Sequence, residues 1–389
     1  MRIVLGDSSL ARYLQGGGYW CIHLQYLLGL KALGHDVFLL ERLRSKGNPD
    51  QDQGLIRTFF QRLREYGLSD QSAVLLSDKD SNEASLDLAT AYGKSKEEVR
   101  NIIGDSDLLW NLCLGVPQPL LAMFRHRVLI DLDPGILQVS AAEVGTHLYD
   151  HHAYMSVGKK LHDSDCEVPT LGLKWHTFHP FVYLPMWNAM PDPGPQAPFT
   201  SVTHWGWGKL QMRDRDLSTS KRKAYLRYVE LPQRAGRPFE LAANIHPDGP
   251  GADQTGDREL MESHGWRLVD PWKVVDSPPV YQSYISRSRA EISCPRPIFR
   301  ELKTGWFSDR SVCYLASGRP VLAEDTGFSD HLPTGEGLLA FQNIEEALAG
   351  VADIDANYDR HKRAARELSQ EFFDSGKVLA RMLDYCATI

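Results

Sequence analysis

The sequence predicts an α/β protein with two doubly wound domains. The chain has 389 residues, more than the ~250–300 at which a single hydrophobic core stops growing, so two domains are expected. It opens with an aliphatic run at 2–5, an amphipathic helix over 20–33 that Gly34 closes, and a second apolar strand at 35–41. This alternation of strand and helix continues along the chain, which is typical of parallel sheets covered by helices.

The first domain is predicted to span residues 1–190. Its further strands are expected at 73–76, 108–112, 127–131 and 154–157, with helices at 54–66 and 96–103. Parallel sheets bind ligands at the carboxyl ends of their strands. The candidate site segments of this domain are therefore the loops that follow strands, at 6–19, 111–119 and 131–138.

A Pro- and Gly-rich segment, 186–198, is predicted to link this domain to a second one over 199–370. The strands expected there are 200–204, 239–242, 267–269, 290–293, 321–323 and 338–341, and the helices are 344–351 and 358–383. The C-terminal segment 371–389 is expected to pack back onto the first domain. Two such domains imply a cleft faced by both sets of strand ends, which suits an enzyme that brings two substrates together.

Composition excludes several classes of protein. A net charge of −7 and a pI near 6.1 argue against a general nucleic-acid binder, and we interpret the basic run 221–223 as a solvated helix face. The six cysteines form no CxxC pair, which favours reduced thiols in a cytoplasmic protein. No apolar run approaches the ~20 residues that span a bilayer. His151, His152, His176 and His179 have no carboxylate or cysteine partner at ligand spacing, so a metal site is not expected.

The segment 303–328 is the strongest functional signal. It combines a polar loop with Gly305, a short apolar helix, a Gly-x-Pro entry into a strand and a second glycine loop. Such an arrangement turns backbone N–H groups and a helix N-terminus toward a phosphate. Ser308, Arg310 and Ser311 add hydroxyl and guanidinium donors at the same place. The alternative interpretation is an αβ unit with a tight surface turn.

Two runs in this part of the chain carry a family resemblance. Residues 305–311 and 314–321 resemble the phosphate-binding loop, helix and following strand in the donor half of GT-B glycosyltransferases. Patchier resemblance is found at 16–18, 30–37, 131–135 and 333–341. The resemblance implies the GT-B fold, in which two Rossmann-like doubly wound domains face a central cleft and bind acceptor and nucleotide-sugar donor respectively. It also implies sugar transfer without a metal ion or other cofactor.

The resemblance, together with the chemistry of the side chains, assigns roles to particular residues. The donor phosphates are expected to contact Gly305, Ser308, Arg310 and Ser311 from the second domain and Gly17 and Gly18 from the first, with Lys209 and Arg296 as weaker candidates. The donor sugar is expected to contact Asp325, Thr326, Gly327 and Phe328. One departure is Cys313, which stands where many retaining members have a glutamate that binds the ribose.

For the general base we predict His23, since it lies early in the first helix beside the loop that faces the cleft. An imidazole with a pKa near neutrality suits removal of a proton from a hydroxyl group. Asp131 or Asp133 is expected to orient the imidazole or to act in its place.

Two other functions stay open at this stage. A GT-B nucleotide-sugar epimerase would turn over the donor without an acceptor, and a non-catalytic binder would hold the donor without releasing nucleotide. A dehydrogenase that uses NAD(P) fits less well, because the first strand–helix turn lacks a compact Gly-x-Gly-x-x-Gly. The sequence does not identify the acceptor, the sugar, the nucleotide or the stereochemistry, and it is compatible with a monomer or a homodimer.

Overall fold

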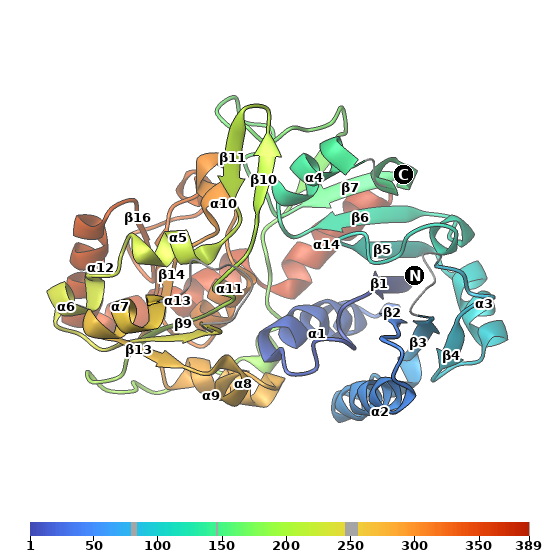
Figure 1. Cartoon of the computed structure of the whole chain (residues 1–389), viewed down its shortest axis with the longest axis horizontal. Coiled ribbons are helices and arrows are strands. Elements are labelled where there is room, and N and C mark those ends of the chain that lie inside the picture. Colours follow the sequence, from blue (N-terminus) through green and yellow to red (C-terminus); the bar gives the residue numbers. More distant parts are fainter. Residues whose placement is uncertain (79–83, 145–146, 246–255, 389) are drawn as a thin grey trace.

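The computed structural model of the protein describes residues 1–78, 84–144, 147–245 and 256–388. Two sheets with flanking helices lie next to each other, and we call the part built on each sheet the first and the second domain (Figure 1). The predicted fold class is confirmed. No described helix combines the length and the apolar character that crossing a membrane requires.

The sheet of the first domain has eight strands in the order β4-β3-β2-β1-β5-β6-β7-β8. All neighbours pair in parallel except β3 and β4. The strands are β1 (Arg2–Asp7), β2 (Asp36–Arg44), β3 (Ser72–Ser77), β4 (Thr90–Tyr92), β5 (Leu108–Leu112), β6 (Arg127–Asp131), β7 (Ala153–Ser156) and β8 (Trp175–Thr177). Its helices are α1 (Gly17–Ala32), α2 (Pro49–Glu65), α3 (Lys96–Asp105) and α4 (Ile136–Val144).

The sheet of the second domain has six parallel strands in the order β13-β12-β9-β14-β15-β16. They are β9 (Phe199–Thr203), β12 (Phe239–Ala243), β13 (Trp266–Val269), β14 (Ala290–Ser293), β15 (Val321–Glu324) and β16 (Leu338–Phe341). The helices are α5 (Lys221–Leu226), α6 (Leu231–Ala235), α7 (Asp257–Ser263), α8 (Pro271–Val274), α9 (Pro278–Ser286), α10 (Pro297–Glu301), α11 (Asp309–Ala316), α12 (Ile344–Ala356) and α13 (Tyr358–Phe372), and the last helix of the chain, α14 (Ser375–Cys386), packs on the first domain. The inner strands are buried on both faces, as is usual in a parallel sheet, although β12, β14 and β15 each carry a buried glutamate (Glu240, Glu291 and Glu324).

A hairpin that the sequence did not predict follows β9. Its strands, β10 (Lys209–Met212) and β11 (Arg215–Ser218), pair with each other and with no other strand. The hairpin packs on α10 of its own domain and on α4 of the first domain, so it bridges the two (Figure 1). Leu217 is fully buried there, in the same hydrophobic cluster as the core of the first domain.

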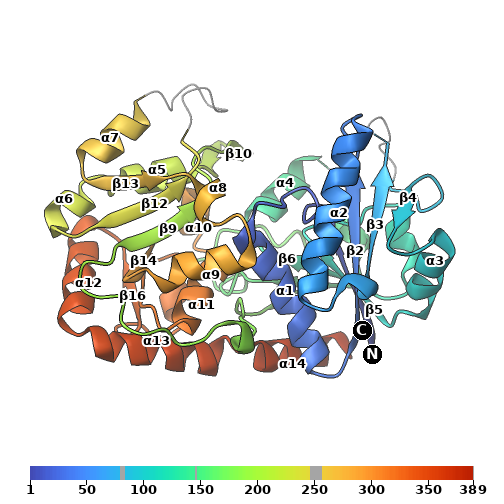
Figure 2. The ribbon, with the colours of Figure 1, turned by 90° about the horizontal axis from the view of Figure 1, so that it is seen from below.

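The predicted helix 358–383 is interrupted. It forms two helices, α13 and α14, because the chain returns to the first domain at Phe373 and Asp374. The Asp374 carboxylate caps α14 by accepting a hydrogen bond from Gly376 N at 2.7 Å. Val182, on the outward crossing, donates to Phe373 O at 2.8 Å, which holds the two crossings together. Past this point α14 packs closely on α1 (Figure 2), where a Cβ at Gly29 would lie 2.6 Å from Leu379 Cδ1.

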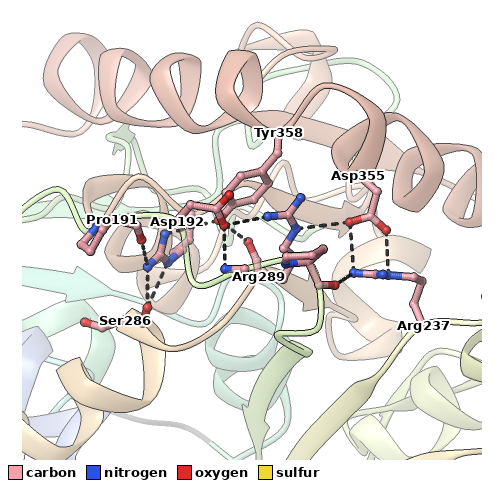
Figure 3. Close-up of polar contacts among 10 residues, drawn as sticks. Pro191, Asp192, Arg237, Ser286, Arg289, Asp355 and Tyr358 are labelled. Carbon is pink, nitrogen blue, oxygen red and sulfur yellow. Dashed lines mark hydrogen bonds and ion pairs between the residues drawn. The ribbon is translucent and has the colours of Figure 1, made fainter.

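The Pro- and Gly-rich connection is fixed to the second domain. Arg289 donates to Asp192 at 2.8 Å and to Asp355 at 3.2 Å, and its guanidinium lies 3.3 Å from the centroid of the Tyr358 ring (Figure 3). Arg319, which is 1% exposed, donates to Pro191 O at 2.8 Å. Because buried guanidinium groups hold this backbone, the segment does not behave as a free flexible linker.

Candidate functional site

Helices α1, α10 and α11 lie between the two sheets in both views (Figure 1 and Figure 2). Two contacts join the second domain to the loop that follows β6. Trp306 Nε1 donates to Leu132 O at 3.2 Å, and the Arg296 guanidinium lies 3.1 Å from Asp133 Oδ1. These contacts place the carboxyl end of β6 against the entry to α11, and the candidate site lies at this junction.

Two cationic side chains of the second domain meet at the junction. Lys221 is the first residue of α5, and its ammonium group lies 5.9 Å from the centroid of the Trp306 ring. Arg296 precedes α10 and lies over the ring of Trp207, which is 56% exposed. Within the described ranges Lys221 has no carboxylate partner, so its amino group is available to an anion.

The electrostatic state of Lys221 supports this description. Burial, together with the positive charges of Arg310 and Arg296, holds the pKa of Lys221 well below its usual range. A bound anion would relieve that repulsion. The interpretation of 221–223 as a solvated helix face was therefore wrong for Lys221. Arg222 pairs with Asp257, and Lys223 is exposed.

Two carboxylates, one from each domain, lie on the same junction. Asp133 has its side chain 44% exposed beside Arg296, and Asp309 is the half-buried first residue of α11. Burial, followed by the negative charge of Asp133, raises the pKa of Asp309 to about 7. A carboxyl group with such a pKa accepts and releases protons near neutral pH, which is the property of a general base.

His23 is poorly placed for the predicted role of base. Its Nδ1 lies 3.0 Å from Tyr19 O and its Nε2 lies 3.0 Å from Asp7 Oδ2, with both side chains of the ion pair almost fully buried. Both ring nitrogens face acceptors, so the imidazolium form fits best. Although burial alone would lower the pKa of His23, the Asp7 carboxylate raises it. No ring nitrogen is free to take a proton from a substrate.

Asp131 is likewise committed to its own loop. Its carboxylate accepts from Ser156 Oγ at 2.7 Å, from Gln138 Nε2 at 2.9 Å and from Asp133 N at 3.0 Å. Burial raises its pKa to about 6, although these hydrogen bonds act in the opposite direction. Asp131 therefore shapes the loop that presents Asp133, and of the three predicted catalytic residues only Asp133 faces the cationic groups at the junction.

Arg310 points into the second domain and away from the junction. Its guanidinium contacts the buried Glu291 carboxylate, Val202 O at 2.9 Å and Ser293 Oγ at 2.9 Å, and the side chain is only 11% exposed. These internal contacts occupy its Nε and both terminal nitrogens. This placement counts against Arg310 as the phosphate ligand that the sequence predicted.

We predict that Arg310→Ala lowers the free energy of unfolding by about 3–5 kcal/mol, because it leaves Glu291 buried without its partner. Urea unfolding measures the loss. Arg234→Ala is the matched control, since Arg234 pairs with Glu345 at the surface and should change stability by less than about 1 kcal/mol. Equal effects of the two substitutions would contradict the structural role of Arg310.

The predicted phosphate loop is closed around its own polar groups. Gly305 N donates to Thr326 O at 2.9 Å, and Ser308 Oγ accepts from Arg310 N as the cap of α11. Ser311 Oγ is fully buried without a partner among the described residues. The void that Ser308 and Ser311 line with Glu324 holds about 10 Å³, room for one water molecule. A phosphate would need this loop to open.

The predicted sugar-binding segment is a self-contained turn. Asp325 accepts from Gly327 N at 2.9 Å and from Ser329 Oγ at 2.6 Å, and Thr326 Oγ1 donates to Trp306 O at 2.6 Å. Phe328 is buried against Phe307. The segment therefore supports the loop at 305–308, and its polar groups are largely occupied.

The remaining predicted phosphate ligands also have other partners. Gly17 N donates to Val275 O at 2.7 Å, and Gly18 lies against Tyr281, so the N-terminus of α1 packs on the second domain. A side chain at Gly17 would collide with Ser277 O. Lys209 is exposed on the hairpin, where it pairs with Asp216. None of these three residues joins Lys221 and Arg296.

Sequence reasoning missed Lys221 and Asp309. Lys221 is the first residue of α5, which follows the β10–β11 hairpin, and Asp309 is the first residue of α11, which follows α10. Neither helix directly follows a strand of the parallel sheet, so the usual signal for a ligand residue, a position just after the carboxyl end of such a strand, did not mark them. Within the described ranges no three His, Cys, Asp or Glu side chains are grouped closely enough to hold a metal ion.

No family model matches the chain, and no curated protein matches its sequence. Solved structures do match over essentially the whole length. Sucrose-phosphate synthase from Thermosynechococcus elongatus aligns at 12% identity with a TM-score of 0.55, covering 100% of this chain and 98% of the other. HepE from Anabaena in complex with UDP and glucose aligns at 12% identity with a TM-score of 0.58, covering 100% of both chains.

An alpha-glucosyltransferase in complex with UDP and a 13-mer DNA aligns at 11% identity with a TM-score of 0.62, covering 99% of this chain and 98% of the other. The chain has the GT-B fold. In this GT-B protein, as in the fold generally, the ligand edges of two parallel sheets face each other, and the cluster of Lys221, Arg296, Asp133 and Asp309 lies where they meet.

Proposed function

We propose that this GT-B protein is a glycosyltransferase that moves a sugar from a UDP-sugar to a hydroxyl group of an acceptor. The observation that carries the proposal is the meeting of two basic side chains with two carboxylates. Lys221, which has no carboxylate partner among the described residues, and Arg296 lie at the junction with Asp133 and Asp309. The two basic side chains suit a diphosphate, and the two carboxylates suit removal of a proton from a hydroxyl group. The UDP bound in HepE and in the alpha-glucosyltransferase supports the choice of nucleotide.

In the proposed reaction the acceptor oxygen forms a bond to the anomeric carbon of the donor sugar. The bond between that carbon and the phosphate oxygen breaks, and its electron pair leaves with UDP. The hydroxyl proton passes to the Asp309 carboxylate, whose pKa of about 7 suits the transfer. Lys221 and Arg296 stabilise the charge that develops on the leaving diphosphate.

We further propose that the reaction needs neither a metal ion nor another cofactor, since two cationic side chains are available for the role that a divalent cation otherwise fills. We also propose a cytoplasmic location, which the six free cysteines support. Arg310, with its internal partners, is replaced in this proposal by Lys221 and Arg296.

Calorimetry with UDP, followed by incubation with UDP-glucose and a panel of hydroxylated acceptors, tests the proposal. We expect UDP to bind, an acceptor to be glucosylated with stoichiometric release of UDP, and both results to persist in EDTA. Conversion of the UDP-sugar to an epimer without acceptor would indicate an epimerase. Binding of UDP without any turnover would indicate a non-catalytic binder, and no binding would remove the proposal.

A further inference from the structure

A pocket of about 480 Å³ lies outside the cluster at the junction. It is formed between the β10–β11 hairpin of the second domain and two parts of the first, namely α4 and the segment 166–169. Its volume falls in the range of small-molecule sites, about 300–1,000 Å³. Nothing in the donor chemistry described above uses this pocket.

The hairpin is firmly attached on both sides, so the pocket is a built feature. Arg215 of β11 forms an ion pair with Glu167, and Leu217 is fully buried. Glu167 N donates to Leu302 O at 3.0 Å, which ties the opposite wall to the second domain as well.

The lining combines an apolar surface with planar polar groups. Val139, Val168 and Met212 supply the apolar part. Glu167, Gln211 and Arg213 also line it, although the Glu167 carboxylate pairs with Arg215 and Gln211 Nε2 donates to Arg213 O at 2.9 Å. The Arg213 guanidinium has no hydrogen bond or ion pair within the described part of the chain. Planar donors and acceptors at the edge of an apolar surface suit a sugar ring, which has hydroxyl groups around its rim and C–H groups on its faces.

The pocket also lies close enough to the junction to hold an acceptor. Asp133 O accepts from Ile136 N at 3.0 Å in the first turn of α4, and Val139 lines the pocket further along the same helix. Asp133 lies three residues before the first residue of α4, and Val139 lies three residues after it. Val168, on the pocket wall, lies 3.6 Å from where a Cβ of Gly135 would be. The pocket wall is therefore continuous with the loop that presents Asp133.

We propose that this pocket is the acceptor site and that the acceptor is a sugar, an inference that rests on the proposed glycosyl transfer. The hairpin of the second domain then completes a site whose other wall belongs to the first domain. It selects the acceptor without touching the donor nucleotide.

Cys166 lines the pocket and provides a test that does not depend on turnover. Burial raises the pKa of its thiol, so N-ethylmaleimide is applied at mildly alkaline pH and the labelled peptide is quantified by mass spectrometry. The probes are D-glucose, D-galactose, N-acetyl-D-glucosamine, maltose and cellobiose. We expect at least one of them to slow labelling of Cys166 and to accept glucose from UDP-glucose. Failure of all five to protect Cys166 overturns the proposal.

Met212→Trp fills the pocket and provides the second test. We expect it to raise the KM for the protecting sugar about tenfold or more, with the affinity for UDP unchanged. Asp216→Trp is the size-matched control on the exposed side of the same hairpin. Unchanged transfer in Met212→Trp overturns the acceptor site alone. Absence of UDP binding in the wild type instead overturns the proposed function. Protection of Cys166 from labelling still shows in that case whether a sugar binds in the pocket.

Discussion

Replacing Lys221 with alanine should weaken UDP binding by about 10- to 150-fold, the range expected when a hydrogen bond to a charged group is lost. The reason is the state of the ammonium group, which is half-buried beside Arg296 and Arg310 and has no carboxylate partner among the described residues. Isothermal titration calorimetry with UDP measures the change.

The position of Lys221 gives this experiment a matched control. Lys223 lies two residues further along α5 and is exposed, so Lys223→Ala removes the same charge from the same helix and should leave UDP affinity within about twofold. Similar weakening by both substitutions would show that only the general positive field matters. No weakening by either would remove Lys221 from the site.

Proton uptake offers an independent check on the same residue. Burial and neighbouring cations hold the pKa of Lys221 well below its usual range, and a bound diphosphate should raise it. A group whose pKa rises on binding takes up protons at pH values between its free and its bound pKa, so UDP binding in that range should be accompanied by proton uptake in the wild type. Titrations in buffers with different ionisation enthalpies measure this uptake, which should disappear in Lys221→Ala.

Most strands were predictable because apolar side chains dominate them, as in Leu338–Phe341. The runs 290–293 and 338–341 are bounded by polar or turn-forming residues, and the structure has strands with the same bounds. The β10–β11 hairpin was not predictable in this way, because its sequence is largely polar and its register depends on α4 and α10.

The site was harder to predict than the fold, and Arg310 shows why. The sequence correctly indicates a loop, a helix and a strand around it, but the direction of its side chain depends on Glu291 in a neighbouring strand. A buried carboxylate without a partner costs several kcal/mol, so the guanidinium turns inward to it. Lys221 presents the opposite case, since none of the described acidic residues forms an ion pair with its amino group, which stays available for a ligand.

Replacing Asp309 with asparagine should lower kcat by about 10²–10⁴-fold, the usual contribution of general base catalysis. The wild-type rate should rise with pH through about 7, because the carboxyl group has a pKa of about 7 and accepts a proton only when ionised. Asp309→Asn should lose this rise. The measurement is the pH profile of kcat with saturating UDP-sugar and acceptor.

Asp133→Asn separates the base from its neighbour. The negative charge of Asp133 contributes to the raised pKa of Asp309, so its removal should shift the rise in kcat to lower pH while activity is retained. Two results would assign the base to another residue. One is a rise in kcat at the same pH in Asp133→Asn as in the wild type, and the other is a rise in kcat with pH that remains in Asp309→Asn.

Stability should report the same pKa without any substrate. The folded-state pKa of Asp309 is about 7, above its ordinary value of 3.8, so the folded protein binds more protons than the unfolded chain between these two values. The free energy of unfolding therefore loses a contribution as pH rises through this window. The Asp309→Asn variant lacks this titrating group and therefore does not lose the contribution. Its free energy of unfolding, relative to that of the wild type, should increase from acidic pH toward pH values above 7. Urea unfolding across this range measures the difference, and a constant difference would mean that the carboxyl group titrates normally in the folded protein.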